Sequence, residues 1–262
     1  MQEYTYVAKK PDKNGLVDFT KEENEVWQML YARQIKLLEG RACHEFIDGV
    51  DKLKLNPTKI PQLGEVSHEL KKATGWQIVP VDALISFKEF FDLLASKSFP
   101  AATFIRRQKD LDYLKEPDIF HEVFGHCPLL THAPFANFTE RIGKLGQNMT
   151  KEERVMLARL YWFTVEFGLV TTNNGLRIYG GGILSSKGES IYALESNIPV
   201  REPFELIKVL RTPYRYDEMQ KKYFIINSFD ELYDLVNTDL RAVFCEAIKF
   251  GLIHEESDIR SC

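Results

Sequence analysis

Two histidines and one glutamate are the residues of this 262-residue chain best suited to do chemistry together. His121 and His126 lie in the segment PDIFHEVFGHCPLL, and Glu166 lies in the apolar run VMLARLYWFTVEFGLV. Because Glu166 is the only acidic residue of that run, we expect its carboxylate to be buried, and a buried carboxylate needs a cation beside it. Two imidazoles and one carboxylate, with coordination positions left open, are typical of non-haem iron(II) oxygenases. The set therefore predicts an iron site.

The spacing of the two histidines is H-E-x-x-x-H, which differs from the H-E-x-x-H of zinc proteases. Five residues advance a regular α-helix by about 500°, which leaves the two side chains about 140° apart. His121 and His126 can bind one ion only if the helix ends or deforms between them. Gly125 is a plausible place for such a deformation.

Other interpretations of these residues stay open at this point. One histidine could lie in the core and the other on the surface, and Arg159 could pair with Glu166, although it lies seven residues away. Zinc could also bind two histidines and a carboxylate, with water as a fourth ligand. Cys127 could ligate beside His126, but its thiol is more typical of a small buried side chain.

Two further carboxylates flank His121. Glu122 would be the general base in a metal hydrolase, would hydrogen-bond a cofactor or a metal-bound water in an oxygenase, or would simply lie on the surface. Asp118 precedes His121 by three residues, within reach of the free ring nitrogen. Such a carboxylate can fix the orientation of a metal ligand, or it can interact with the N-terminus of the helix.

Composition narrows the class of protein. Apolar residues make up 44% of the chain, charged residues 27%, and the net charge is −4, so we expect a globular protein with no nucleic-acid or membrane partner. Four scattered cysteines without a CxxC pair indicate a reducing compartment. There is no secretory signal and no apolar run of about 18 to 20 residues. We predict a cytoplasmic protein.

The pattern of apolar residues predicts long helices and few strands. No βα rhythm appears, so the fold class is mainly α with a few short β-strands, in a single domain over residues 1–262. Residues 1–18 are polar and are expected to be a loosely ordered arm. Ser or Thr followed three residues later by Glu predicts helix starts at Thr20, Ser86, Thr150 and Ser228. The expected helices cover 20–40, 42–49, 63–74, 87–94, a segment from Pro117, 150–169 and 229–250, and the expected strands cover 76–79, 103–106 and part of 174–182, where a Gly-rich loop follows.

Four stretches together carry a specific resemblance. They are IPQLGEVSHELKKATGWQIVPV (60–81), EPDIFHEVFGHCPLL (116–130), YWFTVEFGL (161–169) and IYGGGILSSKGE (178–189). With these stretches in this order, the sequence resembles the pterin-dependent aromatic amino acid hydroxylases over roughly residues 20–235. The resemblance implies a single catalytic domain of that type, with His121, His126 and Glu166 as the iron ligands. It implies no regulatory or tetramerisation domain, and hence a monomer or homodimer.

The resemblance also implies a reaction. L-phenylalanine would be hydroxylated to L-tyrosine with O2, Fe(II) and a tetrahydropterin such as tetrahydrobiopterin. Hydroxylation of tyrosine or tryptophan is the alternative within the family, and a zinc hydrolase with Glu122 as its base is the alternative outside it.

Roles for further residues follow from the resemblance alone. Arg106 would hold the carboxylate of the amino acid with two parallel hydrogen bonds. Phe90 would stack on the pterin ring. The remaining implied contacts are Pro117, Trp162, Gly182 and Ser185 for the substrate, and Leu84, Ile85 and Glu122 for the pterin. Leu114, Phe87 and Tyr216 depart from the residues that the family usually has at these places.

Overall fold

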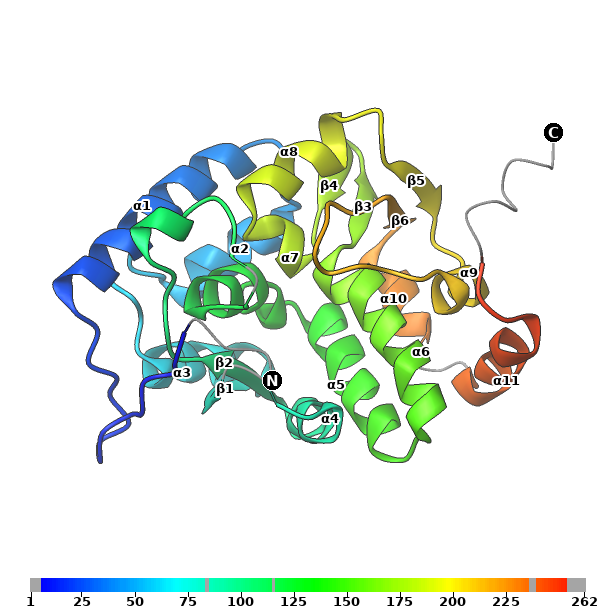
Figure 1. Cartoon of the computed structure of the whole chain (residues 1–262), viewed down its shortest axis with the longest axis horizontal. Helices are drawn as coiled ribbons and strands as arrows, with labels where there is room; N and C mark the ends of the chain where they lie inside the picture. Colours follow the sequence, from blue (N-terminus) through cyan, green and yellow to red (C-terminus); the bar gives the residue numbers. More distant parts are fainter. Residues whose placement is uncertain (1–5, 83–84, 115, 236–238, 254–262) are drawn as a thin grey trace.

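The computed structural model of the chain describes residues 6–82, 85–114, 116–235 and 239–253, and it is mainly helical (Figure 1). The α-helices are α1 (Lys21–Leu38), α2 (His44–Leu53), α3 (Leu63–Thr74), α4 (Phe87–Ala95), α5 (Ala133–Gln147), α6 (Lys151–Tyr161), α7 (Gly181–Leu184), α8 (Lys187–Glu195), α9 (Leu206–Arg211), α10 (Phe229–Leu235) and α11 (Leu240–Phe250). Two short 3₁₀ turns, η1 (Gln108–Asp110) and η3 (Leu129–Thr131), and two π-helical turns, η2 (Phe120–His126) and η4 (Trp162–Glu166), complete the helical part.

The strands form two small sheets on opposite sides of the molecule (Figure 1). β1 (Gln77–Val81) and β2 (Ser98–Ala102) are parallel, and α4 is the helical crossover that joins them. The second sheet has the order β4-β3-β6-β5. Its strands are β3 (Leu169–Thr172), β4 (Gly175–Ile178), β5 (Val200–Pro203) and β6 (Lys222–Ile226). The expected fold class, mainly α with a few short strands, is confirmed.

The predicted helix starts at Thr20 and Thr150 are confirmed. At both positions the hydroxyl accepts a hydrogen bond from the backbone N–H of the glutamate three residues later, and the carboxylate of that glutamate accepts one from the backbone N–H of the threonine. Two donors at the end of each helix are satisfied in this way. Ser86 caps α4 with its own hydroxyl. α3 ends where expected, because Gly75 adopts a left-handed conformation with φ of 82°.

Other predicted elements are wrong in extent. No strand covers 103–106, because β2 pairs with β1 only as far as Val81, which lies opposite Ala102. The helix from Thr150 stops being α-helical at Trp162, and a strand already begins at Leu169. The Gly-rich loop contains the helix α7. The predicted helix over 229–250 is two helices, and Asp239 caps the second of them through a bond from the Arg241 N–H.

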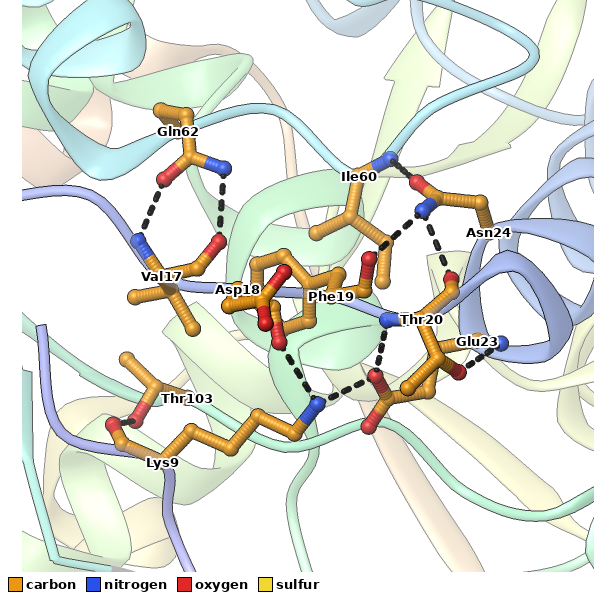
Figure 2. Close-up of polar contacts among 10 residues, drawn as sticks. All are labelled: Lys9, Val17, Asp18, Phe19, Thr20, Glu23, Asn24, Ile60, Gln62 and Thr103. Atoms are coloured by element: carbon orange, nitrogen blue, oxygen red, sulfur yellow. Dashed lines mark hydrogen bonds and ion pairs between the residues drawn. The ribbon is translucent and has the colours of Figure 1, made fainter.

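The N-terminal arm is better held than its polar sequence predicts. Its first five residues lie outside the described part of the chain, but Tyr6 and Val17 are buried. The backbone of Val17 donates to and accepts from the side chain of Gln62, at 2.8 and 3.1 Å. Figure 2 shows this pair beside the contacts of Lys9. Side-chain amides and short polar contacts hold the segment here, which hydrophobic periodicity does not reveal.

One hydrophobic cluster of buried side chains extends from Val26 to Ala247. Helices α5 and α6 lie side by side within it (Figure 1). The turns η2 and η4 and the helix α7 meet at its centre, where they carry the residues singled out above. Among the described residues, no helix combines the length and apolar character that crossing a membrane would require.

Candidate metal centre

The donor atoms of His121, His126 and Glu166 converge on one point. His126 Nε2 lies 3.1 Å from His121 Nε2 and 3.2 Å from one carboxylate oxygen of Glu166. His121 Nε2 lies 3.8 Å from the other oxygen. Two nitrogen ligands about 2.1 Å from one ion, at right angles, are about 3 Å apart. Among the described residues, no other group of three His, Cys, Asp or Glu side chains gathers its donors like this.

A π-helical turn explains how histidines five residues apart can converge. The segment Phe120–His126 is a π-helix, in which hydrogen bonds join residues i and i+5 rather than i and i+4. Residues five apart therefore lie on nearly the same face. The expected deformation is present, but it spreads over the whole turn instead of breaking the helix at Gly125.

Glu166 is placed by the same device on another helix. It is the last residue of η4, where the N–H of Phe167 donates to the carbonyl of Trp162 at 2.9 Å, five residues back. Arg159 does not pair with Glu166, because its guanidinium donates to the carbonyl of Leu210. The proposed Arg–Glu pair is therefore absent, and the histidines are the partners of the carboxylate.

Gly125 and Gly181 let η2 and α7 approach closely. A Cβ atom at Gly125 would lie 2.7 Å from the carbonyl oxygen of Gly181, and one at Gly181 would lie 2.4 Å from His126 Nδ1. Either atom would force the two segments apart. The small residues bring α7, with Ser185 at its end, against both histidines.

Ser185 fixes the proton on the ring of His121. The Ser185 hydroxyl donates to the carbonyl of Gly181 at 2.9 Å, so its oxygen accepts from His121 Nδ1, also at 2.9 Å. With the ring proton on Nδ1, the lone pair on Nε2 is free and directed at the cluster. His126 Nδ1 is buried and has no hydrogen-bond partner among the described residues.

Burial sets the charges of the cluster. It lowers the pKa of His121 to about 4, with Glu166 opposing and His126 adding to the effect, so this ring is neutral near pH 7. Burial raises the pKa of Glu166, but His126 and His121 together bring it below its ordinary value. A neutral His121 ring and an ionised Glu166 carboxylate are in the forms that bind metal ions.

The three side chains face a mainly apolar cavity of about 270 Å³. Its walls come from the β1–β2 sheet, α4, η2, α6, η4 and the loop after α9. The lining residues are Val81, Asp82, Ile85, Phe87, Phe90, Phe91, Phe99, Pro100, Ala102, Pro117, His121, Glu122, Ala158, Tyr161, Trp162, Glu166 and Tyr214. A cavity with aromatic walls, into which three candidate metal ligands point, suits flat, weakly polar ligands.

Comparison with known proteins decides the family. The sequence model of the family of biopterin-dependent aromatic amino acid hydroxylases matches residues 1–258. The chain belongs to this family. It is 52% identical over 252 residues to the phenylalanine-4-hydroxylase of Pseudomonas aeruginosa, with 96% of each protein covered.

Solved structures agree with the assignment to the aromatic amino acid hydroxylases. The apo structure of the cold-active phenylalanine hydroxylase of Colwellia psychrerythraea has a TM-score of 0.93 and 53% identity, and the match covers 95% of this chain and 97% of that one. The phenylalanine hydroxylase of Chromobacterium violaceum, solved with iron(III) and 7,8-dihydrobiopterin, has a TM-score of 0.86 and 43% identity, with 93% and 90% covered. The predicted family and its iron and pterin cofactors are confirmed.

Three of the four residues assigned to the pterin line the cavity. Ile85, Phe90 and Glu122 line it, whereas Leu84 lies outside the described residues. Phe90 is partly buried and meets the ring of Tyr161 edge-on, with centroids 5.1 Å apart. Burial, together with Glu166 and Asp118, raises the pKa of Glu122 well above its ordinary value.

The residues assigned to the substrate divide into two groups. Pro117 and Trp162 line the cavity. Gly182 and Ser185 lie behind the cluster instead: a Cβ atom on Gly182 would lie 3.1 Å from a carboxylate oxygen of Glu166, and Ser185 contacts His121. These two residues therefore support the candidate ligands.

Arg106 is buried and held by Asp118. The Asp118 carboxylate accepts from Nε and Nη2 of Arg106, at 2.8 and 2.9 Å, and from the Arg106 backbone N–H. It also accepts from the backbone N–H of His121 at 3.1 Å, not from the ring, which binds Ser185. Asp118 therefore interacts with the N-terminus of the η2 turn and does not orient the His121 ring. The same carboxylate connects Arg106 with η2.

Two residues that hold Trp162 in place carried no signal in the sequence. The ring of Tyr214 stacks on Trp162, with centroids 4.3 Å apart, and Gln220 accepts a hydrogen bond from the Trp162 indole. Both lie more than fifty residues beyond Trp162, so local spacing could not find them. Tyr161, the last residue of α6, was within reach of prediction, because it lies five residues before Glu166, the same spacing that separates His121 from His126. Cys127 is not a ligand candidate in the structure, since its sulfur faces the Glu122 carbonyl.

Proposed function

We propose that this chain is a phenylalanine 4-monooxygenase, which hydroxylates L-phenylalanine to L-tyrosine with O2, iron(II) and a tetrahydropterin. The observation that carries the proposal is the His121–His126–Glu166 cluster in the wall of an aromatic cavity. Relatives at about half sequence identity, which cover nearly the whole chain, are phenylalanine-4-hydroxylases.

His121, His126 and Glu166 would hold the iron from one side and leave its cavity side open to ligands. When bound, iron(II) and the reduced pterin supply the activation of dioxygen for insertion into the aromatic ring. Ser185 keeps the Nε2 lone pair of His121 available, and Glu166 supplies negative charge. The chain's task is to place the reactants and to exclude water.

The aromatic walls orient the two flat ligands. Phe90 and Ile85 would contact the pterin, and Pro117 with Trp162 would contact the phenylalanine ring. Asp118 takes two N–H groups of Arg106, which leaves the Nη1 edge of the guanidinium to hold the substrate carboxylate. Tyr214 stacks on the Trp162 ring and Gln220 accepts from its indole N–H, and together they fix the orientation of that ring.

The alternatives fit the observations less well. A zinc hydrolase would need Glu122 as an ionised base, but burial raises the pKa of this side chain. Within the family, the curated relatives at 46–52% identity act on phenylalanine by name.

We further propose one catalytic domain over residues 1–262, monomeric or homodimeric and cytoplasmic, without a nucleic-acid or membrane partner. The continuous core supports a single domain, and the net charge of −4 supports the absence of a nucleic-acid or membrane partner. Light scattering on the purified protein measures its oligomeric state.

The test is product formation after anaerobic loading with iron(II), in air with tetrahydrobiopterin and equal amounts of phenylalanine, tyrosine and tryptophan. We expect tyrosine to accumulate from phenylalanine only when iron and pterin are both present. The Glu166→Ala protein should lose bound iron and product together. Hydroxylation of tyrosine or tryptophan in preference to phenylalanine, or retention of zinc without product, would contradict the proposal.

A further inference from the structure

The loop that carries Arg106 has little regular structure of its own. It follows β2, which ends at Ala102, and among its described residues the 3₁₀ turn η1 at Gln108–Asp110 is the only regular element before η2. The Asp118 carboxylate accepts from the Arg106 backbone N–H, and the carbonyl of Phe104 accepts from the N–H of Ile119 at 2.8 Å. An arginine that must meet a carboxylate in one geometry needs the neighbouring residues of its loop fixed as well.

Tyr6 supplies these contacts. Its ring stacks on Phe104, with centroids 5.0 Å apart and planes 12° apart, and the guanidinium of Arg107 lies 5.5 Å from the ring centroid. Its hydroxyl accepts from the backbone N–H of Arg107 at 3.1 Å and donates to the carboxylate of Asp110. The side chain is only 8% exposed. One residue thus contacts the loop on both sides of Arg106.

Lys9 keeps Tyr6 in this place. The Lys9 backbone N–H donates to the carbonyl of Thr103 at 3.3 Å, and the Thr103 hydroxyl returns a bond to the Lys9 carbonyl. The Lys9 ammonium donates to the carbonyl of Asp18 at 2.8 Å and pairs with Glu23 (Figure 2). Glu23 also completes the cap of α1. The segment is therefore tied to the start of a long helix at one end and to the Arg106 loop at the other.

The far end of the loop is anchored without Tyr6. Arg33 on α1 donates to the carboxylate of Asp112 at 2.6 Å and to the carbonyl of Leu111 at 2.8 Å. Loss of Tyr6 should therefore loosen residues 103–110 and leave the rest of the fold in place.

We propose that Tyr6 is a positioning residue for the substrate: through Phe104, Arg107 and Asp110 it fixes the backbone that presents Arg106 to the carboxylate of the amino acid. The inference rests on the proposed function, because it takes Arg106 as the group that holds that carboxylate. It adds the N-terminal segment to the parts of the chain that determine substrate affinity.

The test compares Tyr6→Phe, which keeps the ring and removes the hydroxyl, with Tyr6→Ala, which removes both. Tyr233→Phe, a change in a half-exposed ring on α10, is the matched control. We expect KM for phenylalanine to rise about 3- to 10-fold in Tyr6→Phe, the effect of one or two lost hydrogen bonds, and further in Tyr6→Ala. The value of kcat and the KM for the pterin should stay within about twofold, and the melting temperature should report that the variants fold.

Coupling to Arg106 separates positioning from general loosening. In an Arg106→Ala background, Tyr6→Phe should change kcat/KM by less than twofold, because the group that it positions is gone. Equal effects with and without Arg106, or an unchanged KM in both Tyr6 variants of an active enzyme, would overturn the inference. A wild-type protein that hydroxylates no aromatic amino acid would instead overturn the proposed function.

Discussion

At the scale of single residues, one hydroxyl decides which nitrogen of His121 carries the ring proton. Ser185 is bound to the Gly181 carbonyl, so its oxygen can only accept from the ring. The lone pair of His121 is then fixed in the direction that a metal ion needs. Groups that orient a ligand in this way contribute about 10- to 100-fold to metal affinity.

We therefore predict that Ser185→Ala weakens iron(II) binding by about 10- to 100-fold while the fold survives. The measurement is anaerobic competition with a chelator of known affinity. Ser190→Ala is the matched control: this buried hydroxyl bonds Gln34 on α1, so its loss costs similar stability without touching a candidate ligand. Equal iron affinity in the two variants would contradict the role assigned to Ser185.

Glu189 is a buried carboxylate outside the cluster. It accepts from the Tyr223 hydroxyl and from the Gln220 N–H at 3.1 Å. Burial raises its pKa above the ordinary 4.5, although both hydrogen bonds oppose this effect. Because the folded pKa is raised, the protonated form stabilises the fold at low pH, and this contribution is lost as the pH rises through the folded pKa.

We predict that wild type loses stability relative to Glu189→Gln as the pH rises from about 4 to 7. Urea unfolding of both proteins at a series of pH values measures the difference in free energy of unfolding. Glu39→Gln, a change at an exposed helix end, should show no such trend. A wild type that gains stability relative to Glu189→Gln over this range would show that the folded pKa is lowered instead.

At the scale of elements, the two π-helical turns show what the sequence could and could not predict. The five-residue spacing of His121 and His126 required a deformation, and spacing alone predicted that much. It did not reveal a π-helix, because the turn depends on a neighbour distant in sequence: Gly125 contacts the carbonyl of Gly181. The starts of helices with a strong cap, such as α1 and α6, were predicted correctly for the opposite reason, since the cap is local.

Elements without a local signal were missed. α5 contains two glycines, which lower its helix propensity. Its buried face packs against α4 and α10, which are distant in sequence. β6 pairs with β3 across more than fifty residues, in parallel, so nothing near either strand predicts the pairing. The candidate ligands could be found because the two histidines lie in one short motif and Glu166 lies in another. Tyr6 and Tyr214 carry no such motif, since only tertiary packing places them.

The close approach of η2 and α7 makes Gly125→Ala a test of the π-helical turn. The new Cβ would lie 2.7 Å from a backbone oxygen, so the turn must shift, at a cost of about 1 to 3 kcal/mol. We expect a lower melting temperature and weaker iron binding together, because His126 moves with the turn. Gly64→Ala on α3, where a Cβ meets no atom within 4 Å, should be neutral or slightly stabilising. Full iron affinity in Gly125→Ala would argue against a rigid turn.

At the scale of the whole molecule, the cluster joins parts of the chain that are far apart in sequence. His121 and His126 come from η2, Glu166 comes from η4, and α7 supports all three. A ligand that binds only the folded state stabilises it by an amount that grows with its concentration over Kd. An ion bound by η2 and η4 should therefore stabilise the entire fold and not only the cavity.

Saturating iron(II) under anaerobic conditions should accordingly raise the melting temperature of the wild type. At a concentration 100 times Kd the gain is about 2.7 kcal/mol, which corresponds to roughly 5 to 10 °C for a chain of this size. Calorimetry with and without a chelator measures the shift. It should vanish in Glu166→Ala and persist in His68→Ala, whose exposed imidazole lies on α3 away from the cluster. A shift of the same size in Glu166→Ala would mean that the stabilising ion binds elsewhere and that Glu166 is not its ligand.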